Sequence, residues 1–203
     1  MSTHFPITTS RIEAFSDGVI AIIITVMVFD LKITEAISED DFWKAIVNLL
    51  PKLLSYVVSF LVLAILWVNH HQLFHQIKHS DGALLWYNLH LLFWMSLIPF
   101  ATSLIGANPG LWHATAFYSL IFLFNSWAFA LLRKYVNRKE LLHESISLEA
   151  QRKILRKNRL ALGMYLGAAL LSPISIYPSF VLLLLVPAMY FIPEKITTKN
   201  TNP

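Results

Sequence analysis

The chain alternates between long apolar runs and short polar connections. Six apolar segments cover residues 15–31, 53–69, 83–105, 111–132, 160–176 and 177–192. The third and fourth are long enough for a helix, rising about 1.5 Å per residue, to cross a hydrocarbon core of about 30 Å. The last is short, because only 14 residues run from Ser179 to Ile192. The pattern predicts an all-α integral membrane protein with six transmembrane helices in a single domain, residues 1–203.

The first apolar segment begins with charged residues. Only Gly18 to Phe29 is free of charge, so we expect Arg11 to Asp17 to continue the helix at an interface or inside a bundle. Arg11 and Asp17 are six positions apart, about 240° around a helix. Each side chain therefore needs a partner on another element. In a purely structural alternative, Ser16 caps the following turn and Asp17 interacts with the positive end of the helix dipole.

Composition supports a membrane protein and narrows its chemistry. The 203 residues are 56% hydrophobic and 14% charged, with a mean hydropathy of +0.58. There is no cysteine, which excludes disulfides, thiolate metal sites and cysteine nucleophiles. The sequence also lacks G-x-S-x-G, H-E-x-x-H, Walker and G-x-G-x-x-G motifs and the TVGYG potassium filter. We therefore expect no enzyme, no cofactor and no channel with a carbonyl-lined filter.

Basic residues gather in one connection between apolar segments. Residues 133–159 contain nine of them: Arg133, Lys134, Arg138, Lys139, Arg152, Lys153, Arg156, Lys157 and Arg159. Such clustering orients membrane spans and does not indicate nucleic-acid binding, so we expect this segment to be cytoplasmic. With six spans, both termini and the connection near residues 70–82 then lie on the same side. The stretch "RKELLHESISLEAQRKILRKN" is typical of a helical extension that faces solvent or lipid headgroups.

Polar side chains recur within the apolar segments. His71, His75 and His79 follow one another at i,i+4 spacing, which can present imidazoles to zinc, but no carboxylate lies within that stretch. They are weak metal candidates, and we expect no bound metal. Trp67 fits a membrane-interface residue. Three further residues are expected to form hydrogen bonds between helices: Asn88, His90 and Asn125.

Four stretches carry a resemblance to a known family. They are "R-I-E-A-F-S-D-G-V", "W-V-N-H-H-Q-L-F", "N-L" and "L-I-P-F-A-T". Together they resemble a prokaryotic, single-repeat member of the transmembrane protein 175 family of potassium channels. The motifs cover the first three segments, and span count and topology extend the likeness to the rest. The resemblance implies a homotetramer in the cell inner (plasma) membrane, with the first helices lining a central pore for potassium ions.

The resemblance also assigns residues. It implies that one set packs and hydrogen-bonds the pore helices to their neighbours: Arg11, Phe15, Ser16, Asp17, Trp67, His70 and Asn88. It implies a bulky apolar pore constriction at Ile22, with further layers at Thr25 or Val26 and at Phe29. Phe29 stands where leucine is expected in the family. An apolar ring gates by dewetting and selects ions by the cost of removing their water, so selectivity for potassium over sodium should be modest.

Two other functions fit the same sequence. A secondary transporter would bind a coupling proton or cation at Asp17, although no internal repeat of the kind found in many transporters is present. A membrane scaffold would use the basic segment to contact lipids or proteins. For the channel, the expected partners are further copies of the chain, the lipid bilayer and potassium ions, with no nucleic acid.

Overall fold

The computed structural model describes residues 8–33, 38–142 and 148–191, and within these ranges the chain is helical. The long helices are α1 (Thr9–Val26), α2 (Phe42–His75), α5 (Trp112–Arg138) and α6 (Leu148–Leu171). The shorter ones are α3 (Gly82–Ser96), α4 (Ile98–Ala107) and α7 (Ile176–Phe191), with 3-10 turns η1 (Met27–Asp30) and η2 (Glu39–Asp41). The all-α prediction is confirmed.

Four stretches are long and apolar enough to cross a membrane: Thr9–Asp30, Glu39–His75, Gly82–Ala107 and Trp112–Arg138. They match the first four predicted segments, except that Leu31 and Leu111 fall just outside. The sixth predicted segment corresponds to α7, a shorter apolar helix. The fifth lies mainly in the second half of α6, which ends at Leu171, five residues before the predicted boundary.

Three boundaries differ from the predictions. The helix of the second segment begins at Phe42, well before residue 53, and continues through Pro51. The third segment is interrupted at Leu97, where α3 ends and α4 begins with Pro99 in its first turn. Proline has no amide hydrogen to donate to the preceding turn, which explains the break. Residues 133–159 are not one connection, because 133–138 end α5 and 148–159 begin α6.

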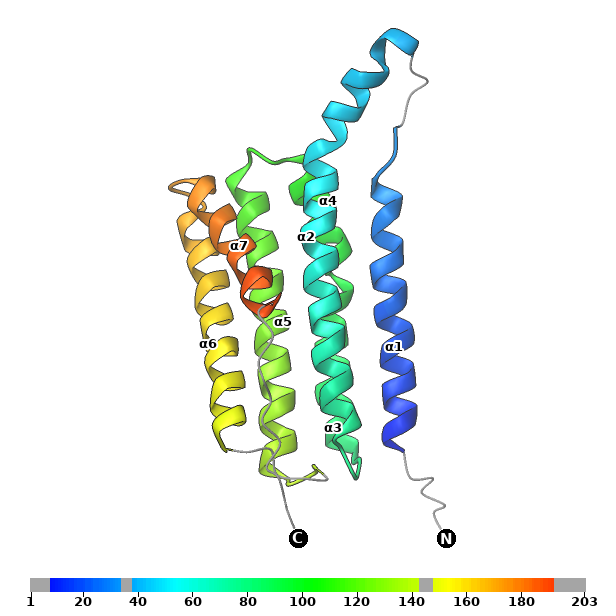
Figure 1. Ribbon diagram of the computed structural model, residues 1–203, viewed down its shortest axis with the longest axis vertical. Helices are drawn as coiled ribbons and strands as arrows, with labels where there is room; N and C mark the ends of the chain where they lie inside the picture. The colour runs from blue at the N-terminus through cyan, green and yellow to red at the C-terminus, as the bar shows by residue number, and fades with distance from the viewer. Residues whose placement is uncertain (1–7, 34–37, 143–147, 192–203) are drawn as a thin grey trace.

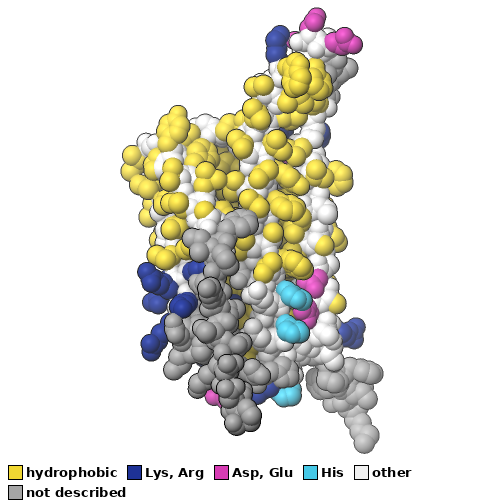
Figure 2. Space-filling model, viewed as in Figure 1, with side chains coloured by type: hydrophobic (Ala, Val, Ile, Leu, Met, Phe, Trp, Pro, Cys, Tyr) yellow, Lys and Arg dark blue, Asp and Glu magenta, His cyan; other side chains and the backbone are white. Residues whose placement is uncertain are grey.

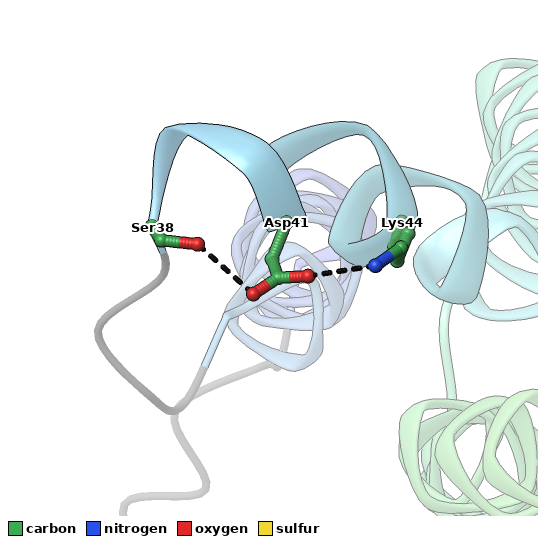
Figure 3. A network of polar contacts seen from close by, with 3 residues as sticks. All are labelled: Ser38, Asp41 and Lys44. Atoms are coloured by element: carbon green, nitrogen blue, oxygen red, sulfur yellow. Dashed lines mark hydrogen bonds and ion pairs between the residues drawn. The ribbon is translucent and has the colours of Figure 1, made fainter.

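The long helices lie side by side, and successive helices run in opposite directions, except that α4 continues in the direction of α3 (Figure 1). Helix α1 begins at one end of the bundle, which also holds the α2–α3 connection, the end of α5 and the start of α6 (Figure 1). The α1–α2, α4–α5 and α6–α7 connections lie at the other end. At this second end, the first turns of α2 extend beyond the bundle (Figure 1). Just before them, Asp41 accepts hydrogen bonds from Ser38 and Lys44 at 2.9 Å each (Figure 3).

Helix α3 is fixed at its start by Asp81. The carboxylate accepts a hydrogen bond from the backbone amide of Leu84 at 2.7 Å, which caps the helix, and another from the hydroxyl of Tyr135 on α5. Burial raises the pKa of Asp81, but these hydrogen bonds outweigh it and hold the pKa below its ordinary value. The cap thus joins α3 to α5.

Helix α1 lies at the edge of the bundle (Figure 1). It contacts α2, α3 and α4. Its buried residues recur every three or four positions and therefore form one face: Ile12, Ser16, Ile20, Ile23 and, in η1, Met27. The opposite face of α1 contacts none of the described residues closely enough to be buried, which makes this helix unlike the central α5.

Candidate functional site

The candidate site begins with a buried hydrogen-bond network that joins three helices. Asn88 on α3 donates from Nδ2 to Ser16 Oγ on α1 at 2.8 Å. The Oδ1 atom of Asn88 lies 2.8 Å from Nε2 of His70 on α2. All three side chains have an exposed fraction of 0%. The network therefore holds α1 against α2 and α3 without any contact to solvent.

Ser16 takes part in this network from the middle of its helix. Its hydroxyl donates to the carbonyl of Ile12 at 2.7 Å and accepts from Asn88. Helix α1 begins at Thr9, so the alternative in which Ser16 caps a helix start is wrong.

A second contact joins α1 to α2 beside the buried network. Trp67 donates from Nε1 to Oδ1 of Asp17 at 3.0 Å. Asp17 thus has its partner on another helix, as its position relative to Arg11 requires. Arg11 and Phe15 are exposed on α1. Among the described residues neither takes part in the hydrogen bonds of Ser16 and Asp17, so the structure of one chain brings together five of the seven residues of the proposed network.

Two other polar residues behave differently from the expectation. His90 accepts a hydrogen bond from Trp94 at 3.0 Å, and Asn125 donates to the carbonyl of Ile121 at 2.9 Å. Each bond joins two residues of the same helix, α3 for His90 and α5 for Asn125. The Oδ1 atom of Asn125 is buried without a partner. For these two residues the prediction of bonds between helices was wrong.

The three histidines with i,i+4 spacing do not all lie on one helix. His71 and His75 lie on α2, with ring centroids 6.3 Å apart, but His79 lies beyond the end of the helix. The three imidazoles therefore do not form one row. His71 instead faces α1, where its Nδ1 atom lies 3.1 Å from Oε1 of Glu13. The i,i+4 spacing places Glu13 and Asp17 on one face of α1, but nothing in the sequence indicated that His71 would meet them.

The predicted pore residues share the unpartnered face of α1 and of η1, which continues it. Ile22 and Phe29 are 62% and 74% exposed, and Thr25 and Val26 are exposed between them. The hydroxyl of Thr25 lies 3.0 Å from the carbonyl oxygens of Ala21 and Ile22, to which it donates. Its oxygen lone pairs are therefore left as acceptors on an otherwise apolar surface.

Comparison with known proteins places this arrangement in a family. A family model described as "Endosomal/lysosomal potassium channel TMEM175" matches residues 11–99. Potassium channel HX13_20290 from Chryseobacterium is 44% identical over 133 residues, 66% of this chain and 67% of the relative. Potassium channel Cha6605_3372 from Chamaesiphon minutus is 33% identical over 189 residues, 90% and 93% of the two chains. This chain belongs to the TMEM175 family.

The TMEM175 match includes both halves of the chain. A crystal structure titled as a lysosomal potassium-selective channel TMEM175 homolog from Chamaesiphon minutus superposes with a TM-score of 0.77 and 30% identity. It covers 90% of this chain and 96% of that one. The family model alone, residues 11–99, contains the whole hydrogen-bond network of Ser16, Asp17, Trp67, His70 and Asn88. The resemblance read from the sequence motifs is confirmed.

Proposed function

We propose that this TMEM175 chain is the subunit of a potassium-permeable channel, in which four copies assemble so that their α1 helices line a central pore. The observation that carries the proposal is the division of α1 into two faces. One face packs on α2, α3 and α4, and the other presents Ile22, Thr25, Val26 and Phe29 to the outside of the chain.

Lipid contact alone explains exposed apolar residues, so the polar features of α1 matter. The hydroxyl oxygen of Thr25 on the outer face can accept contacts from a partly dehydrated cation. The hydrocarbon chains of lipids offer this oxygen no polar partner. The buried bond of Ser16 to α3 and the bond of Asp17 to Trp67 on α2 fix the rotation of α1 about its own axis, so that the same residues face outward. A pore-lining helix without a filter loop needs such a support. The relatives named as potassium channels agree with this assignment.

The ion path follows from the order of residues along the outer face. Four copies of Ile22 form the constriction, which blocks ions by dewetting because branched alkyl groups do not replace lost water. Thr25 offers oxygen atoms one turn further, and Val26 and Phe29 add apolar layers beyond it. Selectivity for potassium over sodium is modest in this design, since no ring of backbone carbonyls replaces the hydration shell.

The proposal includes six membrane crossings and a defined orientation. In it, α3 and α4 together make one crossing, and α6 and α7 each make one, with a thinner bilayer or flanking residues accommodating the short α7. The end of the bundle at which α1 begins is cytoplasmic, because the basic end of α5 and the basic first half of α6 lie there. Both termini are then cytoplasmic as well. The membrane is the cell inner (plasma) membrane.

The test is potassium and sodium flux into proteoliposomes that contain the purified protein. Ile22→Asn should raise potassium flux per tetramer and reduce discrimination against sodium, because the amide wets the constriction. Leu170→Asn is the matched control, since Leu170 is an exposed aliphatic residue on α6, on the far side of the bundle from α1 (Figure 1). It should leave the flux per tetramer unchanged.

Three results would contradict the channel proposal or part of it. A tetramer of normal abundance in which Ile22→Asn changes neither flux would remove Ile22 from the ion path. Saturable flux that requires a second ion and is lost in Asp17→Asn, without single-channel steps, would establish the transporter alternative. Absence of any flux from correctly assembled protein would favour the scaffold.

A further inference from the structure

Three potential metal ligands converge between α1 and α2. Glu13, Asp17 and His71 each offer one ligand atom, and these atoms lie within 4.8 Å of one another. His71 is about half exposed, whereas Glu13 is only 21% exposed. On the visible face, histidine and acidic side chains lie next to each other below the apolar surface (Figure 2). The cluster is therefore accessible from water at the end of the bundle that holds the N-terminus.

The helical geometry explains why these side chains meet. Glu13 and Asp17 are four residues apart and project from the same side of α1. His71 approaches them from the last two turns of α2. Within the described residues, no lysine or arginine forms an ion pair with either carboxylate. Two negative charges at this distance repel each other, so a bound cation would stabilise the cluster.

We propose that Glu13, Asp17 and His71 bind a divalent transition-metal ion, and that Zn²⁺ fits the site best. One imidazole nitrogen and two carboxylate oxygens form a ligand set that zinc accepts, with water in the fourth position. Magnesium prefers six oxygen ligands and is disfavoured by the imidazole. Tetrahedral zinc with bonds of about 2.1 Å holds its ligands about 3.4 Å apart, so the cluster contracts slightly by rotation of the exposed side chains.

Trp67 orients two of the three ligands. Its indole Nε1 donates to Oδ1 of Asp17, which leaves Oδ2 of Asp17 for the metal. Its ring also stacks on His71, with centroids 5.8 Å apart and an interplanar angle of 25°. Ligands in metal sites are commonly held by such outer partners, because fixed rotamers lower the entropic cost of binding. Trp67, which lies on α2, therefore fixes the orientation of one ligand on each helix: Asp17 on α1 and His71 on α2.

A metal ion at this position would tie α1 to α2. This consequence rests on the proposed function, in which α1 lines the pore, and on one added premise: the pore opens by a shift of α1 relative to α2 without rotation about its own axis. Zinc should then reduce potassium flux. Binding itself does not depend on the channel proposal, because the three ligands all belong to one chain.

The experiment measures zinc binding and potassium flux on the same purified protein. Binding is followed by competition with a chromogenic chelator, and the wild-type chain should bind one Zn²⁺ ion. Glu13→Gln and His71→Ala should each weaken the affinity by about tenfold or more. His75→Ala is the matched control, since His75 is an exposed imidazole on the next turn of α2 and is not one of the three clustered ligands. Zinc should inhibit flux through the wild type and His75→Ala only.

Each contrary result overturns a defined part of the proposal. Unchanged affinity in Glu13→Gln and His71→Ala, in protein with a normal elution profile and melting temperature, excludes the site. Loss of affinity in His75→Ala but not in Glu13→Gln assigns the ion to the His71–His75 pair. Equal affinity for Mg²⁺ refutes the choice of metal. Zinc binding as expected without inhibition refutes the effect on α1, whereas absence of flux without zinc counts against the channel and leaves the binding result standing.

Discussion

Asn88 is the residue whose removal should most directly separate α1 from its neighbours. The substitution Asn88→Ala deletes the donor to Ser16 and the acceptor for His70, both at 2.8 Å. Ser16 retains its bond to the carbonyl of Ile12. His70 loses its partner at Nε2, and its Nδ1 already has none. The imidazole would then be fully buried with neither nitrogen hydrogen-bonded.

The expected cost follows from these contacts. Hydrogen bonds between helices in membrane proteins contribute about 0.6 kcal/mol each on average. Leaving a buried polar group unpaired costs about 1–3 kcal/mol. The lost bond to His70 and the unpaired nitrogen of His70 describe the same change, so these two costs are not added in full. We expect Asn88→Ala to lower the free energy of unfolding by about 2–3 kcal/mol. For a chain of this size, this loss corresponds to a fall in melting temperature of about 4–12 °C.

Asn125→Ala provides the matched control, measured by thermal melting in detergent. Asn125 is also fully buried, but it bonds only to Ile121 within α5 and its Oδ1 has no partner. Both substitutions remove the same atoms and leave the same cavity, so their difference reports the bonds between helices. The melting temperature of Asn88→Ala should lie at least about 4 °C below that of Asn125→Ala. Equal melting temperatures would refute the assignment of Asn88 as the residue that joins α1 to the bundle.

Two further predictions concern packing and orientation. Gly106→Ala should destabilise the chain by about 1–3 kcal/mol, because a Cβ atom would lie 2.6 Å from Ser55 Oγ and 3.0 Å from the Cα atom of Lys52. Gly163→Ala, where a Cβ atom meets nothing within 4 Å, should not destabilise it, and equal thermal melts of the two variants would contradict close packing of α2 on α4. The chain lacks native cysteine, so Asp40→Cys should react with an impermeant reagent on intact cells, and His79→Cys only after permeabilisation. The opposite labelling would reverse the proposed orientation.

Local sequence determined the helices and the family. The apolar runs could only form helices in a membrane, because every backbone amide and carbonyl there needs a partner within its own segment. The motifs around Ser16 and Asp17 identified the TMEM175 family before any contact was known. The sequence located the ends of the helices less well. The start of α2 at Phe42 and the end of α5 at Arg138 lie in polar or mixed stretches, where hydropathy gives no sharp edge.

The pairing of side chains was decided by tertiary structure. Helical periodicity showed that Asp17 needs a partner on another element, but it named neither Trp67 nor the closeness of His71 to Glu13. Asn88 and Asn125 look alike in sequence, yet only Asn88 faces two other helices, because the rotation of each helix in the bundle sets where its amide points. Likewise, the uncharged stretch from Gly18 to Phe29 has no face that its own sequence marks as outward. Packing of Ile12, Ser16, Ile20 and Ile23 on the bundle is what leaves Ile22 and Thr25 exposed.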